Sequence, residues 1–333
     1  MKRIFSIVLA LAVVFAFSGC GSSDAKVTLG EYKGLSAEKK VYELTQDIID
    51  EYIESELEGA SEDVTVDGPA AKGNGVYLYF TVSSGDEVIE DNSEDGFPVY
   101  LGDGDYGDEF DEKLIGAKAG DHLTFTADYF GEQADFDVTV DSVFNTVIPK
   151  YTDKFIKDMG YSSKAEYEKE VKESLEAEME SESLHELMDN LFSQIVDTST
   201  FENTEELLKK YVEDYKNYYT EYASMFGLDY EGMLEAFGMT EEDVSAEAEA
   251  AMKVSLVAEK IAEAEGIELT DDEVDEIVAQ FAEDEGYESA EAFLEENGED
   301  DVKSYILQER VFEFLVENSN ITEVKAKYEG YDE

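Results

Sequence analysis

The sequence predicts an α+β protein in which a small antiparallel β domain with one short helix is followed by an all-α domain. Three observations support this prediction. Between Val64 and Val143, apolar residues alternate with polar ones, which is the period of half-buried strands. After Pro149, apolar residues recur at steps of three and four, which is the period of amphipathic helices. Two of the three prolines, Pro69 and Pro149, bracket the alternating block and are interpreted as domain boundaries.

The charge balance is strongly acidic and narrows the classes of function. The 333 residues include 84 Asp and Glu against 24 Lys and Arg, which gives a formal net charge of -60. Nucleic acids are therefore repelled, and acidic residues spread along helical faces keep such a surface soluble. The two histidines, His122 and His185, stand in unrelated sequence contexts, and neither has a second histidine nearby. We therefore expect no metal site, no cofactor and no acid-base catalysis.

Residues 1–20 have the pattern of a bacterial lipoprotein signal peptide. A basic start precedes an apolar run from Ile4 to Phe17, which is too short for a comfortable membrane span and ends in a lipobox at Cys20. Cys20 is the only cysteine, so it has no partner for an internal disulfide. We expect a diacyl or triacyl anchor on Cys20 and an extracytoplasmic protein held at the bacterial cell membrane. An ordinary signal peptide with an incidental cysteine is the alternative.

Residues 21–67 are predicted to form a linker and a first helix. The linker extends from Ser22 to Lys40, and the helix extends from Thr45 to Leu57, with Thr45 as its N-cap and Gly59 as its stop. Apolar residues of this helix fall on one face, which predicts that the face is buried.

Residues 68–148 are predicted to form the β domain. Period-two alternation or a high content of strand-forming residues predicts strands in four segments: Val76–Val82, Pro98–Leu101, Leu123–Ala127 and Phe136–Val140. One short helix is predicted from Asp108 to Ile115, with Asp108 as its N-cap and Gly116 as its stop.

Residues 149–320 are predicted to be helical, and residues 321–333 are expected to be frayed. Capping-box patterns at Ser163–Glu166 and Thr270–Glu273 predict two helix starts. Glycines that mark helix ends are Gly227, Gly238, Gly266, Gly286 and Gly298.

The most regular stretch, Leu184–Phe226, predicts two long amphipathic helices. Aromatic residues fill one face of the second helix, namely Tyr211, Tyr215, Tyr218, Tyr219, Tyr222 and Phe226. A phenol ring covers apolar surface while its hydroxyl stays hydrated, which suits a surface that is sometimes exposed. These residues are candidates for binding other polypeptides, and packing against neighbouring helices is the alternative.

This order of elements resembles trigger factor, a family of bacterial chaperones with an FKBP-type peptidyl-prolyl isomerase domain. Val27–Leu35 is similar to the family's linker before the isomerase domain, and Leu114–Asp121 to the segment after its short helix. Met239–Asp243 and Ile261–Val274 are similar to the C-terminal chaperone domain. The resemblance covers about Val27 to Asn320. It implies an FKBP-like β domain, a helical chaperone domain, and unfolded or nascent polypeptides as partners.

The family's N-terminal ribosome-docking domain is not matched, and the lipoprotein signal stands in its place. The resemblance therefore implies a secreted variant whose partners are unfolded secreted chains and, through the lipid, the membrane. Neither the ribosome nor nucleic acid is expected as a partner, because the family's docking domain is not matched and the chain is strongly acidic.

The resemblance also implies the residues of an isomerase pocket. Rotation about an X-Pro bond faces a barrier of about 18–20 kcal/mol, and FKBP-type domains lower it with an aromatic-lined pocket rather than a nucleophile. Matching positions are Phe80, Phe97, Tyr106, Phe110 and Phe136. A packed β-sheet core is the alternative for each of these aromatic residues.

Three features of the pocket depart from the family. Gly107 replaces an isoleucine that holds substrate, Asp108 replaces a proline, and the loop from Tyr129 to Phe136 is shorter. The acidic residue at the pocket rim matches either Glu90 or Asp91. Both an active and an inactive isomerase pocket are therefore compatible with the sequence.

We expect a membrane-anchored chaperone that captures unfolded segments with tyrosine, phenylalanine and methionine side chains, including Met225, Met233 and Met239. The first alternative is an active prolyl isomerase whose helices only position the β domain. A solute-binding lipoprotein is less favoured, because that class is built from alternating βα units. A calcium site at Asp103–Asp108 is a weakly supported fourth hypothesis, because an EF-hand-like loop needs glycine where Asp108 stands.

Overall fold

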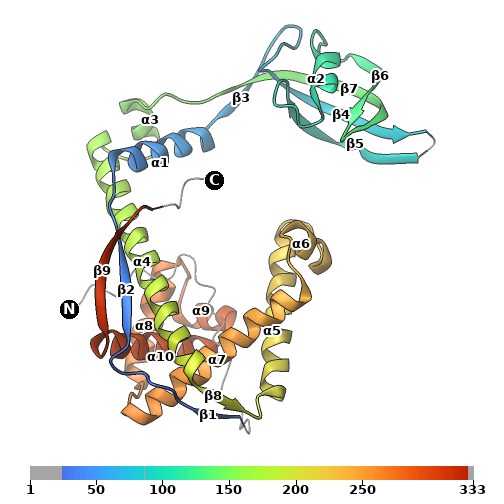
Figure 1. Ribbon diagram of the computed structural model, residues 1–333. Helices are drawn as coiled ribbons and strands as arrows, with labels where there is room; N and C mark the ends of the chain where they lie inside the picture. The colour runs from blue at the N-terminus through green and yellow to red at the C-terminus, as the bar shows by residue number, and fades with distance from the viewer. Residues whose placement is uncertain (1–24, 86, 329–333) are drawn as a thin grey trace. The chain divides into compact units, whose positions relative to one another are not determined.

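The computed structural model describes residues 25–85 and 87–328, and it divides the chain into two compact units (Figure 1). We call Thr45–Val171 the β unit and residues 25–44 together with 172–328 the helical unit. The α+β class that the sequence predicts is confirmed. The β unit extends beyond the predicted domain of residues 68–148, because it includes the first helix and the segment after Pro149.

A five-stranded antiparallel sheet forms the centre of the β unit. In this sheet β7 pairs with β3, β4 and β6, and β4 also pairs with β5, so β5 lies at one edge. The strands are β3 (Glu62–Thr65), β4 (Gly75–Ser84), β5 (Glu87–Tyr100), β6 (His122–Tyr129) and β7 (Glu132–Val147).

The core of the β unit lies on one face of this sheet, under the short helix α2 (Asp108–Leu114). Alternate residues of β4 are buried, which confirms the alternation predicted for Val76–Val82. Phe110 and Leu114 of α2 pack into the same cluster. The predicted N-cap of this helix is wrong, because Gly107 is the cap and Asp108 is the first helical residue. Gly107 has a φ of 91°, a left-handed conformation that glycine adopts without strain.

Two further helices belong to the β unit, α1 (Gln46–Gly59) and α3 (Asp153–Asp158). Thr45 caps α1 as predicted, since its hydroxyl accepts a hydrogen bond from the Ile48 amide at 3.4 Å. α1 buries Ile49 and Ile53 of the predicted stripe.

The helical unit contains most of α4 (Lys164–Thr198) and six more helices. Its main core joins Leu191 of α4 to Ile261 of α7 and Leu315 of α10, and a second cluster lies among α8, α9 and α10. The additional helices are α5 (Glu205–Met225), α6 (Tyr230–Ala236), α7 (Glu241–Glu265), α8 (Asp271–Asp284), α9 (Ala290–Asn297) and α10 (Glu299–Glu317). Apolar side chains that recur every three or four residues fill these cores, as the sequence predicts for the helices after Pro149.

The predicted linker and the predicted frayed tail are both wrong for the described residues. β1 (Lys26–Thr28) pairs antiparallel with β8 (Thr200–Glu202), and β2 (Ser36–Tyr42) pairs in parallel with β9 (Asn320–Ala326). Ala37 of β2 also packs on the main core of the helical unit. These segments are ordered because backbone pairing and apolar contacts offset the entropy of fixing the chain.

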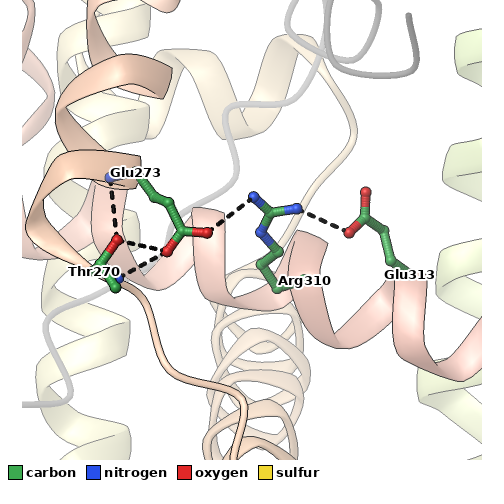
Figure 2. Close-up of polar contacts among 4 residues, drawn as sticks. All are labelled: Thr270, Glu273, Arg310 and Glu313. Atoms are coloured by element: carbon green, nitrogen blue, oxygen red, sulfur yellow. Dashed lines mark hydrogen bonds and ion pairs between the residues drawn. The ribbon is translucent and has the colours of Figure 1, made fainter. Parts of the chain in front are cut away.

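One of the two predicted capping boxes forms completely. The hydroxyl of Thr270 accepts a hydrogen bond from the Glu273 amide at 3.3 Å, and the Glu273 carboxylate accepts one from the Thr270 amide at 3.1 Å (Figure 2). In the other box the Ser163 hydroxyl accepts from the Glu166 amide at 3.2 Å, but the Glu166 carboxylate accepts from the amide of Ser162 at 2.8 Å.

Arg310 connects the start of α8 to α10. Its guanidinium lies 3.9 Å from the carboxylate of Glu273 and donates a hydrogen bond to Glu313 at 3.1 Å (Figure 2). The same Glu273 carboxylate therefore caps α8 and pairs with α10. This arrangement fixes the position of one helix end against its neighbour.

We expect Glu309 of α10 to make the stability of the helical unit depend on pH. Burial raises the pKa of Glu309 from 4.5 to about 7. Because the folded-state pKa is the higher one, this contribution is full below pH 4.5 and is lost as pH rises through about 7. Glu309→Gln is expected to raise the free energy of unfolding at pH 8 by about 1–3 kcal/mol and to reduce its slope between pH 5 and 7.

The measurement is urea unfolding of the full chain at pH 5.5 and pH 8, followed by circular dichroism. Glu317→Gln, on an exposed residue of the same helix, is the control for removing one negative charge. An unchanged slope in the Glu309→Gln variant would contradict the assignment.

Candidate functional site

The β unit brings the five predicted pocket residues into one aromatic cluster. Tyr106 lies at its centre, with ring centroids 5.3 Å from Phe80, 6.3 Å from Phe97 and 5.2 Å from Phe110. The ring of Phe136 lies 5.0 Å from that of Phe110. Edge-to-face and tilted contacts of this kind hold aromatic rings in fixed positions.

Burial divides these five residues into two groups. Phe80, Phe110 and Phe136 are at most 2% exposed and form part of the β-unit core. Phe97 is 43% exposed, and Tyr106 is half-buried against the core. Only Phe97 and Tyr106 of the five are therefore accessible from solvent, whereas the three buried rings lie in the core.

Glu90 of β5 completes this cluster. The Tyr106 hydroxyl donates a hydrogen bond to one carboxylate oxygen of Glu90 at 3.0 Å, and the Tyr129 hydroxyl donates to the other at 2.7 Å. Glu90, and not Asp91, is thus the acidic residue beside the aromatic rings, since Asp91 accepts a hydrogen bond from the amide of Ser93 at 3.0 Å.

The same contacts keep both phenols protonated. Burial, followed by the hydrogen bond to Glu90, raises the pKa of Tyr106 above its ordinary value. The hydrogen bond to Glu90, followed by burial, raises the pKa of Tyr129 to about 12. Tyr129 was not among the predicted pocket residues. It lies two residues after Ala127 and four after Phe125, so the alternation of a strand places all three on the same face of β6.

A tight hairpin turn borders the cluster. Phe130 and Gly131 connect β6 to β7 with φ values of 51° and 93°, and two positive φ values are typical of a two-residue type I′ turn. Phe130 is 80% exposed, and its ring centroid lies 4.6 Å from that of Tyr129. A bulky residue in the left-handed region carries strain of about 1 kcal/mol or more, so this exposed ring is held against a local cost.

The chemistry available at this cluster is binding rather than bond cleavage. The cluster offers aromatic rings, one carboxylate and two phenols, and none of these is an activated nucleophile. Among the residues that the structure describes, no group of three or more His, Cys, Asp or Glu side chains is arranged to hold a metal ion.

The predicted aromatic face falls into a buried part and a half-buried part on α5, and an exposed part at Phe226, which follows the end of α5. Tyr211 is 1% exposed and packs with Ala248 and Met252 of α7, which agrees with the alternative of packing against a neighbouring helix. Burial also raises the pKa of Tyr211 to about 12. The remaining tyrosines of this face are half-buried: Tyr215, Tyr218, Tyr219 and Tyr222.

The exposed part continues into a patch that we call the apolar tip, made of Met225, Phe226, Leu228 and Phe237. These side chains are 78%, 60%, 39% and 57% exposed, respectively. The ring centroid of Tyr222 lies 5.1 Å from that of Phe226 and 6.1 Å from that of Phe237, so Tyr222 contacts both rings. An exposed apolar cluster of this kind is typical of an interaction site.

Helix ends place the apolar tip. Gly227 and Gly238 have φ values of 70° and 63°, which end α5 and α6 as the sequence predicts. Leu228 and Phe237 were missed from the sequence, although each lies directly beside one of these glycines, where a helix end leaves side chains exposed. Of the other two predicted methionines, Met233 is 1% exposed and Met239 is half-buried.

A cleft of about 880 Å³ lies elsewhere in the helical unit, between α4 and α7. Both apolar side chains and carboxylates line it. The residues that line it include Met188, Phe192, Val254, Asp189, Glu247 and Gln308.

The helices that the structure describes include none with the length and apolar character required to cross a membrane. Cys20 and the predicted signal peptide lie outside the described residues.

Comparison with known proteins gives consistent matches. Residues 164–317 match the family described as bacterial trigger factor protein C-terminus. The chain is 29% identical over 318 residues to trigger factor from Finegoldia magna, which covers 90% of this chain and 72% of that protein. It is 28% identical over 325 residues to trigger factor from Lysinibacillus sphaericus, which covers 93% of this chain and 76% of that protein.

A solved structure also aligns with this chain, from work on promiscuous substrate recognition in folding and assembly activities of the trigger factor chaperone. The alignment has a TM-score of 0.44 and 18% sequence identity, and it covers 88% of this chain and 73% of the other.

Proposed function

We propose that this chain, whose residues 164–317 match the bacterial trigger factor C-terminus family, is a protein-folding chaperone that captures unfolded polypeptides. The observation that carries the proposal is the apolar tip, where Met225, Phe226 and Phe237 are each more than half exposed. Exposed apolar side chains that follow or end the two helices α5 and α6 supply binding energy without requiring a partner of one fixed shape.

Capture of varied segments follows from the chemistry of these side chains. Methionine is unbranched and polarisable, so Met225 repacks around different apolar partners. Phe226 and Phe237 offer large flat surfaces at low cost in side-chain entropy. The net charge of -60 opposes association between complexes and keeps a bound unfolded segment soluble.

The proposed place of action is the extracytoplasmic face of the bacterial cell membrane. The basic start, short apolar run and lipobox at Cys20 support a lipid anchor, although they lie outside the described residues. Acyl burial supplies such an anchor with affinity that does not depend on charge, so an acidic protein is held near an acidic membrane. Unfolded secreted chains are then the proposed partners.

The experiment that tests this function is aggregation of a chemically denatured client protein diluted into buffer. Light scattering is expected to fall as the full chain is added up to stoichiometric amounts. The slow, proline-limited phase of refolding is expected to keep its rate, because capture does not change the isomerisation barrier. Scattering that is unaffected by a stoichiometric amount of this protein would contradict the proposal.

A second candidate function is prolyl isomerisation at the aromatic cluster around Tyr106 and Glu90. The ring contacts of Tyr106 and the two phenol hydrogen bonds to Glu90 favour it, since they form a fixed aromatic surface beside a carboxylate. A solute-binding role is not favoured, because the described sheet of the β unit is antiparallel and is not built from βα repeats.

We predict weak or no turnover on short X-Pro peptides. Gly107 gives no side-chain contact where the family has isoleucine, and the turn at Phe130 is only two residues long. Losing about 2.7 kcal/mol of contacts that strengthen during rotation costs roughly a hundredfold in rate. The measurement is kcat/KM on a proline-containing peptide, with Phe97→Ala as the variant that removes the accessible ring. Efficient turnover that falls in Phe97→Ala would replace this prediction with the isomerase function.

A further inference from the structure

We propose that Met225 is a site of reversible oxidation, and that its sulfoxide weakens capture at the apolar tip. The inference rests on the proposed chaperone function and adds a form of regulation to the same site. The reactant is hydrogen peroxide or another two-electron oxidant of sulfides.

Exposure distinguishes Met225 from the other methionines that the structure describes. Met225 is 78% exposed at the end of α5, whereas Met159 in the β unit is 38% exposed. Met239 is half-buried, and four further methionines are at most 8% exposed: Met179, Met188, Met233 and Met252. Since peroxide must reach the sulfur from solvent, Met225 is expected to react first.

The described chain contains no cysteine, since Cys20 is the only one in the sequence. Thioether sulfur is therefore the oxidisable sulfur of both units. In the reaction, the lone pair of the Met225 Sδ attacks one oxygen of peroxide, the O–O bond breaks, and an S=O bond forms. Proton transfer to the leaving oxygen releases water, so the sulfide is oxidised by two electrons and the peroxide is reduced.

The structure makes this change consequential at the tip. Met225 is the most exposed of the four tip residues and directly precedes Phe226, which is 60% exposed. Oxidation converts a flexible apolar side chain into a polar one. A client segment on the tip must then cover a polar sulfoxide, for which the adjoining Phe226, Leu228 and Phe237 offer no hydrogen-bond donor in their side chains.

The first test uses the full chain and dilute hydrogen peroxide. Peptide mapping by mass spectrometry is expected to show sulfoxide at Met225 several times faster than at Met159, and slowest at Met252. If Met159 or a buried methionine reacts before Met225, the proposed oxidation site is wrong. This result does not depend on chaperone activity.

The second test measures the effect on the tip. Peroxide treatment is expected to reduce both aggregation suppression and binding of an apolar fluorescent dye at least threefold. Methionine sulfoxide reductases supplied with a dithiol should restore both, because the dithiol is oxidised to a disulfide while the sulfoxide oxygen leaves as water. Met225→Leu, compared only with itself before and after peroxide, should lose this sensitivity, whereas Met159→Leu should keep it.

The outcomes separate the oxidation proposal from the chaperone proposal. Unchanged dye binding and suppression after complete oxidation of Met225 would overturn the regulatory role. Equal sensitivity of Met225→Leu and the unsubstituted protein would also overturn it. If untreated protein fails to suppress aggregation, the chaperone function is contradicted, and the dye readout still decides whether oxidation makes the tip polar.

Discussion

Replacing Phe226 and Phe237 together by serine is expected to abolish most of the aggregation suppression by this protein. The two side chains are 60% and 57% exposed, so more than half of each is available for contact with a client segment. Covering each ring contributes about 1–2 kcal/mol of binding free energy. Loss of both rings therefore weakens client binding by roughly a hundredfold.

A matched control is available in the β unit. Phe130→Ser removes an aromatic ring that is 80% exposed but is remote in sequence from the apolar tip. The control should retain suppression, and all variants should keep the helical circular dichroism and unfolding midpoint of the parent, because exposed rings contribute little to the fold. Full suppression of aggregation by the Phe226→Ser/Phe237→Ser variant would show that the apolar tip is not needed to bind clients.

Replacing Cys20 by serine is expected to move the protein from the membrane fraction to the soluble fraction. The thiol of Cys20 is the proposed attachment point of the acyl chains, and serine does not replace it in lipoprotein processing. Two or three acyl chains contribute about 0.8 kcal/mol for each buried CH₂ group, so their loss removes essentially all of the membrane affinity. The effect on partitioning is all or none.

The measurement is cell fractionation together with metabolic labelling by a fatty acid. Ser22→Ala, a substitution close to the same site, should keep both the label and the membrane location. If the Cys20→Ser variant remains membrane-bound after its signal peptide is removed, the lipid anchor is not what holds the protein.

Local signals in the sequence predicted the elements that local interactions determine. Thr45 and Thr270 are N-caps because a hydroxyl accepts an amide within the same turn, and such short-range contacts are visible in four consecutive letters. The alternation of β4 predicted its buried face for the same reason. The cap at α2 was misplaced by one residue because Gly107 ends the preceding turn with a positive φ.

Pairing between distant segments was not visible in the sequence. β2 pairs with β9, and Ser36 lies opposite Asn320 in the parallel register. Both strands carry charged residues and lack strict alternation, so each resembles a linker or a tail when considered alone. The two segments form regular strands because they pair with each other and pack on the core of the helical unit.

In the candidate sites, too, local patterns were visible in the sequence, whereas burial by distant segments was not. The family resemblance named five aromatic residues that the structure brings together, but it did not separate buried rings from the accessible Phe97 and Tyr106. On α5 the spacing of the tyrosines predicted one face, and burial by α7 divides it at Tyr211. Phe237 was missed because its exposure depends on how α6 ends against α5, which periodicity alone does not specify.

The most direct test of capture at the apolar tip uses the methionine methyl groups as probes in the full chain. Methyl-labelled methionine gives one NMR signal from Met225 at the tip, one from Met188 in the cleft and one from the buried Met252. On addition of an unfolded client, the Met225 signal is expected to shift or broaden first, while that of Met252 stays unchanged. A client that binds and leaves the Met225 signal unperturbed, with the changes confined to Met188 or Met159, would contradict the account.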